Sequence, residues 1–90
     1  MHMNRHQLLT ALREAGVPDD WYGINTRDLR SFVFKLESVP VLVQALDDRW
    51  YIEVFERGEQ RYPAVFDAEE EACAYLHDSV MNQWNHHRSQ

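Results

Sequence analysis

The segment Arg49–Arg57, RWYIEVFER, alternates between two sets of side chains. One set is apolar and consists of Trp50, Ile52 and Val54, and the other consists of Tyr51, Glu53, Phe55 and Arg57. A period of two places the sets on opposite faces of a β-strand, and it is typical of a sheet with one covered face. The chain is therefore constrained to build a sheet whose inner face receives the apolar set.

Three more segments carry strand signals, and they are Ser31–Glu37, Val39–Leu46 and Arg61–Phe66. The second is expected to begin after its proline. Pro63 confines the third to a sheet edge, because proline donates no hydrogen bond to a neighbouring strand. Asp47-Asp48 and Gly58 mark hairpin turns. The stretch Gly23–Arg30 shows no periodicity and is expected to be a loop.

A helix is predicted over residues 5–15. Its apolar residues recur at helical spacing and are Leu8, Leu9, Leu12 and Ala15. Asn4 is a favourable N-cap, and Gly16 supplies the left-handed residue that ends the helix. Just beyond it, the segment PDDWY, residues 18–22, is expected to form a short helical turn that carries Trp21 and Tyr22 onto the core.

A second helix is predicted to begin after Asp67, which is expected to form a capping box with Glu70. Its apolar face consists of Ala72, Cys73, Leu76, Val80 and Trp84. Residues 1–3 and 85–90 are expected to be flexible ends.

The order helix, strands, helix predicts an α+β fold. We expect two layers: an antiparallel meander of three or four strands, with the N-terminal and the C-terminal helix packed on one face. Ninety residues are enough for one two-layer core, so residues 1–90 are expected to form a single domain.

The net charge and the cysteine content limit which partners and which cellular compartment are expected. Fifteen Asp and Glu against nine Lys and Arg give a formal charge of −6, which repels nucleic acid and anionic lipid and attracts basic partners. No apolar run approaches the roughly 20 residues that cross a bilayer. A single cysteine makes no internal disulfide, so we expect a cytoplasmic protein that binds neither nucleic acid nor membrane.

The residues that could carry chemistry have simpler structural interpretations. His86 and His87 are adjacent and diverge on a helix, and only His2 and His6 show a zinc-like spacing. Cys73 lies on an apolar helix face, where a buried thiol is expected, and the helix dipole favours the acidic residues that begin that helix. We therefore predict no catalytic residue, metal or cofactor, and no enzymatic activity.

The outward set of Arg49–Arg57 is the best candidate site. Two aromatic rings, a carboxylate and an arginine are typical of protein-docking surfaces, which are enriched in Tyr, Phe and Arg. Two alternatives stay open: the same face is the seam of a homodimer, or it is an ordinary solvent-exposed face.

Three segments resemble a group of small bacterial proteins encoded beside polymorphic secreted toxins. These are ALREAGVPDDWYGI (Ala11–Ile24), WYIEVFERG (Trp50–Gly58) and FDAEEEACAYL (Phe66–Leu76). The group is identified with immunity proteins, which are non-enzymatic inhibitors of their cognate toxins.

The resemblance implies a cytoplasmic, acidic domain that docks on a cognate toxin, often over a basic active site that attracts it electrostatically. The expected partner-binding residues are Tyr51, Glu53, Phe55, Arg57, Asp19, Asp20, Trp21 and Tyr22. The alternative is a structural or regulatory homodimer that pairs through its open sheet face.

Overall fold

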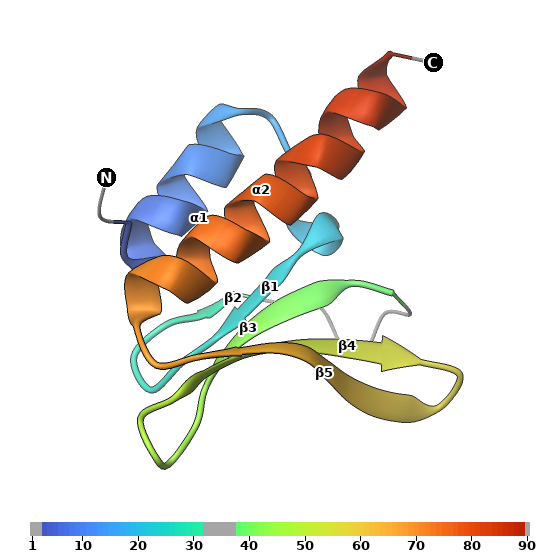
Figure 1. Cartoon of the computed structure of the whole chain (residues 1–90). Helices are drawn as coiled ribbons and strands as arrows, with labels where there is room; N and C mark the ends of the chain where they lie inside the picture. Colours follow the sequence, from blue (N-terminus) through green and yellow to red (C-terminus); the bar gives the residue numbers. More distant parts are fainter. Residues whose placement is uncertain (1–2, 32–37, 90) are drawn as a thin grey trace.

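The structure, a computed structural model, describes residues 3–31 and 38–89. It has two layers, in which the helices α1 (Arg5–Glu14) and α2 (Glu69–Arg88) lie over one face of a β-sheet (Figure 1). The predicted α+β class and the placement of both helices on one face are confirmed.

The sheet contains the predicted meander and extends beyond it. Within the described residues its strands follow the order β2-β1-β3-β4-β5. They are β1 (Gly23–Asn25), β2 (Arg30–Ser31), β3 (Pro40–Gln44), β4 (Trp50–Glu56) and β5 (Glu59–Phe66). The strands β3, β4 and β5 form an antiparallel meander, whereas β1 pairs with β3 in parallel, so the sheet is mixed.

The loop predicted over Gly23–Arg30 is wrong at both ends, because Gly23–Asn25 form β1 and Arg30 begins β2, whereas residues 26–29 are the turn between them. Ile24 is fully buried and lies opposite Leu42 of β3. Thr26 closes the β1–β2 turn, since its Oγ1 donates to the Leu29 carbonyl at 3.0 Å and accepts from the Leu29 N–H at 3.1 Å. The strand predicted over Ser31–Glu37 lies outside the described residues after Ser31.

The boundaries of α1 agree with the prediction. Asn4 and Gln7 form a capping box, in which each side chain accepts from the backbone N–H of the other residue, at 2.8 and 2.9 Å. At the other end, Gly16 adopts a φ of +84°. Its N–H and that of Val17 donate back to carbonyls of the last helical turn, as glycine-terminated helices do.

The predicted start of α2 is wrong by one residue. The N-cap is Ala68, which has no capping side chain, and the helix begins at Glu69. Asp67 is instead exposed and forms a long ion pair of 3.6 Å with Arg49. The helix continues through Arg88, so the flexible tail expected at 85–90 is helical over most of its length.

The core lies between the helices and the inner face of the sheet. Its fully buried large side chains are Tyr22, Leu8, Leu12, Ile24, Leu42, Ile52, Leu76, Val80 and Cys73. The buried thiol predicted at Cys73 is confirmed, and burial followed by the nearby Glu69 charge raises the pKa of that thiol to about 12. A thiol in this state is a poor nucleophile.

Candidate functional site

Strand register defines which side chains point away from the helices. Leu42, Ile52 and Ala64 are direct cross-strand partners on the face that packs against α2. One residue along each strand, Val43, Tyr51 and Val65 are also direct partners. Since side chains alternate along a strand, this second row lies on the opposite face of the sheet.

A β-bulge adds a second aromatic ring to this outer face. Ile52 pairs with Ala64 and Val54 with Arg61, so Tyr62 and Pro63 together lie opposite the single residue Glu53. The Tyr62 ring then packs edge-to-face on Tyr51, with 5.7 Å between ring centroids and an angle of 71°. A bulge on an edge strand also suits Pro63, which has no N–H to donate.

We call the set Val43, Tyr51, Tyr62 and Val65 the open-face patch. Tyr62 is 52% exposed and Val65 47% exposed, which is high for large apolar side chains. Carboxylates border the patch: Asp47 accepts from the Tyr51 hydroxyl at 3.4 Å, and Glu53 accepts from Gln60 at 3.2 Å. The patch is therefore an aromatic and aliphatic surface with an acidic margin.

The predicted outward residues of β4 divide into two groups. Tyr51, Glu53 and Phe55 alternate with the buried Trp50 and Ile52 and are half-buried on the outer side. Arg57 lies beyond the end of β4, in the turn to β5, where its φ is +52°. Its place is therefore set by the turn and not by the face of the strand.

The predicted turn at residues 19–22 forms the short helix η1 (Asp19–Trp21), but one of its residues is unavailable to a partner. Tyr22 is fully buried, and its hydroxyl donates to Asp19 at 3.1 Å. Burial and this hydrogen bond raise the pKa of Tyr22 to about 12. The partner-binding role predicted for Tyr22 is corrected to a core role.

The other aromatic residue of this turn packs on the helix layer. Trp21 is half-buried against Trp84 and His87 of α2, at centroid distances of 5.1 and 5.2 Å. The open-face patch is on the opposite side of the sheet. The structure therefore separates the predicted binding residues into two surfaces, one on each layer.

A charged cluster that sequence reasoning missed joins the starts of both helices. Arg5 donates to both oxygens of Asp28, at 2.7 and 2.8 Å, and to Glu69 Oε2 at 2.7 Å. Glu69 Oε2 also accepts from the Arg5 backbone N–H at 3.0 Å. Arg5 holds the pKa of Asp28 well below its usual range, and both carboxylates raise the pKa of Arg5. The mutual pairing suits a structural role.

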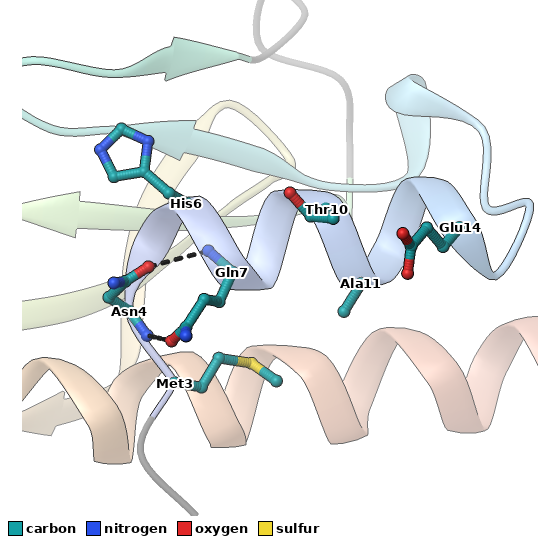
Figure 2. A pocket seen from close by; sticks show the side chains of 7 residues that line it. All are labelled: Met3, Asn4, His6, Gln7, Thr10, Ala11 and Glu14. Carbon is teal, nitrogen blue, oxygen red and sulfur yellow. Dashed lines mark hydrogen bonds between the residues drawn. The ribbon is translucent and has the colours of Figure 1, made fainter.

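A pocket of about 460 Å³ lies along α1 (Figure 2). Its lining consists of Met3, Asn4, His6, Gln7, Thr10, Ala11 and Glu14. Asn4 and Gln7 already bond to each other in the capping box (Figure 2). Because every described lining residue belongs to α1 or to the two residues before it, the described part of the pocket is a groove on one helix. It does not bring together groups from different elements, as a reactive site would require.

Within residues 3–31 and 38–89, no group of three or more His, Cys, Asp or Glu is placed to hold a metal ion. None of the helices described is both long enough and apolar enough to span a membrane. Comparisons with family models, with curated proteins and with solved structures gave no match to this chain. The resemblance to immunity proteins thus stays a prediction.

Proposed function

We propose that the chain is a non-enzymatic immunity protein that binds and neutralises a cognate bacterial toxin domain in the cytoplasm. The observation that carries the proposal is the open-face patch, in which exposed Tyr62 and Val65 adjoin half-buried Tyr51 on a face opposite both helices. Aromatic residues at the centre of a surface and polar residues at its rim are typical of protein interfaces.

The chemistry of the patch suits tight docking. The Tyr51 and Tyr62 rings already pack on each other, so binding a partner would cost little additional side-chain entropy. The acidic margin and the formal charge of −6 would attract a basic toxin surface and raise the association rate. Neutralisation of this kind requires only that the open-face patch bind to the toxin and cover its surface.

Co-expression tests the proposal. If a secreted protein with a variable C-terminal toxin domain is encoded immediately upstream, its toxin domain should arrest growth alone and be tolerated with this chain. Tyr62→Ser should weaken binding about tenfold or more, as removal of an interface anchor does. Tyr75→Ser is the matched control, because Tyr75 is an aromatic residue of α2 that is 41% exposed on the other layer.

Two results would contradict the proposal. A toxin that stays lethal in the presence of the wild-type chain would exclude neutralisation. If Tyr75→Ser impaired protection and Tyr62→Ser did not, the interface would lie on the helix layer.

The second candidate function is a homodimer that pairs through the same face. The row Val43, Tyr51, Val65 crosses three adjacent strands and would offer a continuous apolar surface to a second copy. Size-exclusion chromatography over a range of concentrations distinguishes the two. A dimer that persists at low concentration and is abolished by Tyr62→Ser would favour self-association over toxin binding.

A further inference from the structure

A pocket between η1, α2 and the two residues that precede β3 contains the carboxylate of Asp20, whose neighbour Asp19 is already paired. The pocket is about 270 Å³ in volume and is lined by Asp20, Trp21, Ser38, Val39 and Gln83. Asp19 accepts from Tyr22 and lies 3.4 Å from Arg13. Asp20, in contrast, is exposed and has no hydrogen bond or ion pair with any described residue. Its charge is therefore available to a ligand.

The walls of the pocket are held in place by contacts outside it. Trp21 packs edge-to-face on Trp84 and contacts His87. Ser38 donates its backbone N–H to the Phe55 carbonyl at 2.9 Å and has a φ of +65°. Left-handed backbone at a non-glycine residue is uncommon and is found more often at functional sites. The pocket is thus formed before a ligand arrives.

The lining selects for a cation with several donors. It offers the Asp20 carboxylate, the Ser38 hydroxyl and the Gln83 amide oxygen as acceptors beside the Trp21 indole, and the described residues that line it include no cationic side chain. A guanidinium group carries five N–H donors and packs well against tryptophan, whereas an ammonium group is a more strongly hydrated point charge. The volume is below the usual range of about 300–1,000 Å³ for small-molecule pockets, so it suits a single side chain.

We propose that this pocket receives an arginine side chain of the partner protein. The inference rests on the proposed function, because it names the chemistry by which a basic toxin would be recognised. The guanidinium donates to Asp20 and packs against Trp21, and the chain's formal charge of −6 favours a basic partner at long range.

A small guanidinium probe tests the pocket without the toxin. Ethylguanidinium chloride is titrated into the ¹⁵N-labelled chain, with ethylurea as a neutral probe of similar shape and butylammonium as the ammonium probe. The indole N–H of Trp21 and the amides of Asp20 and Gln83 should shift and saturate with ethylguanidinium alone. Equal shifts with ethylurea, or an equal response to butylammonium, would overturn the guanidinium assignment.

Two variants make the test specific. Asp20→Asn should weaken the ethylguanidinium response about tenfold, which corresponds to loss of one charge-assisted hydrogen bond. Glu71→Gln is the charge-matched control and should leave it unchanged, because Glu71 precedes Gln83 by twelve residues on α2, about 18 Å along the helix. The spectra themselves show whether each variant folds. Equal binding by Asp20→Asn and the wild-type chain would refute the proposal.

The two proposals fail separately. If the toxin is neutralised but the probe does not bind, the immunity function stands and the arginine pocket does not. If the probe binds but the toxin is not neutralised, the pocket stands as a guanidinium site and the partner is a different basic protein. Where the toxin binds, Asp20→Asn should reduce its affinity about tenfold relative to Glu71→Gln.

Discussion

Replacement of Glu69 by alanine should destabilise the fold, because a single carboxylate oxygen of Glu69 accepts two hydrogen bonds from Arg5. Glu69 Oε2 accepts from the Arg5 backbone N–H at 3.0 Å and from Arg5 Nη1 at 2.7 Å. The two side chains are 25% and 24% exposed, so water only partly replaces these bonds. Hydrogen bonds to charged groups contribute about 1.5–3 kcal/mol each. Allowing for partial exposure and for hydration of the freed N–H, we expect a loss of about 2 kcal/mol.

Glu69 also stabilises the fold through the dipole of α2, and a control variant separates this contribution from that of the hydrogen bonds. Glu69 and Glu71 both lie in the first turn of α2, where an acidic residue is worth about 0.3–1 kcal/mol. Glu71 has no partner among the described residues, so Glu71→Ala should lose the dipole contribution alone. The destabilisation by Glu69→Ala should therefore exceed that by Glu71→Ala by about 2 kcal/mol, or about 8–16 °C in Tm for a domain of this size.

Chemical denaturation followed by circular dichroism measures both variants. Glu69→Ala should also be measured in the Arg5→Ala background, which keeps the backbone N–H of residue 5 but removes the guanidinium. The resulting double-mutant cycle isolates the hydrogen bond between Arg5 Nη1 and Glu69. In 1 M NaCl the coupling energy between Arg5 and Glu69 should decrease, since the Debye length falls to about 3 Å. Equal destabilisation by Glu69→Ala and Glu71→Ala would refute the reasoning, because the tertiary bonds would then contribute nothing.

Three further predictions follow from the titrating groups and the turns. Burial raises the pKa of Cys73 from 9.0, and that of Tyr22 from 10.0, to about 12. In the unfolded chain these groups ionise at lower pH than in the folded chain. The free energy of unfolding should therefore be unaffected below about pH 9 and fall towards pH 12. Urea denaturation should show this loss starting later in Cys73→Ala. Arg5 lowers the pKa of Asp28, so stability should be intact above about pH 4 and decline below it, and thermal unfolding of Asp28→Asn should show a smaller decline. Arg57 and Gly58 have φ values of +52° and +80°, so Arg57→Asn should raise stability by about 0.5–1 kcal/mol in chemical denaturation, and a decrease would mean that the arginine side chain contributes more than its backbone costs.

Local patterns predicted the elements that carry their own signals. The apolar spacing between Asn4 and Gly16 determined α1, because a capping side chain and a left-handed glycine both act within one turn. Strand β1 has three residues, too few for any periodicity. Its parallel pairing with β3 depends on a long connection, and no local pattern encodes such a pairing.

The start of α2 shows how a tertiary contact overrides a local preference. Asp67 and Glu70 match the capping-box sequence, yet the helix begins at Glu69. Glu69 binds Arg5, a residue 64 positions away, and that partner cannot be read from the segment itself. The charges of the first turn still favour the helix, because the dipole acts on any acidic residue placed there.

The candidate surfaces were predictable only in part, for a related reason. Alternation correctly placed Tyr51 and Glu53 outside, because β4 is regular at those positions. Tyr62 was missed because the bulge changes which residues of β5 face outwards. Tyr22 was expected both to pack onto the core and to bind a partner, and its complete burial is compatible only with the first of these roles.

Electrostatics distinguishes the two occupants proposed for the open face. Pro63 and the bulge obstruct pairing along the β5 edge, so a second copy would have to dock face to face. In such a symmetric dimer the same patch meets itself, which brings the Asp47 and Glu53 carboxylates of two chains together, each chain carrying a formal charge of −6. Added salt screens this repulsion and should strengthen a dimer. The same salt should weaken binding to a basic toxin, because it screens an attraction. The sign of the salt dependence therefore identifies the occupant, and affinity that rises with salt would count against the toxin.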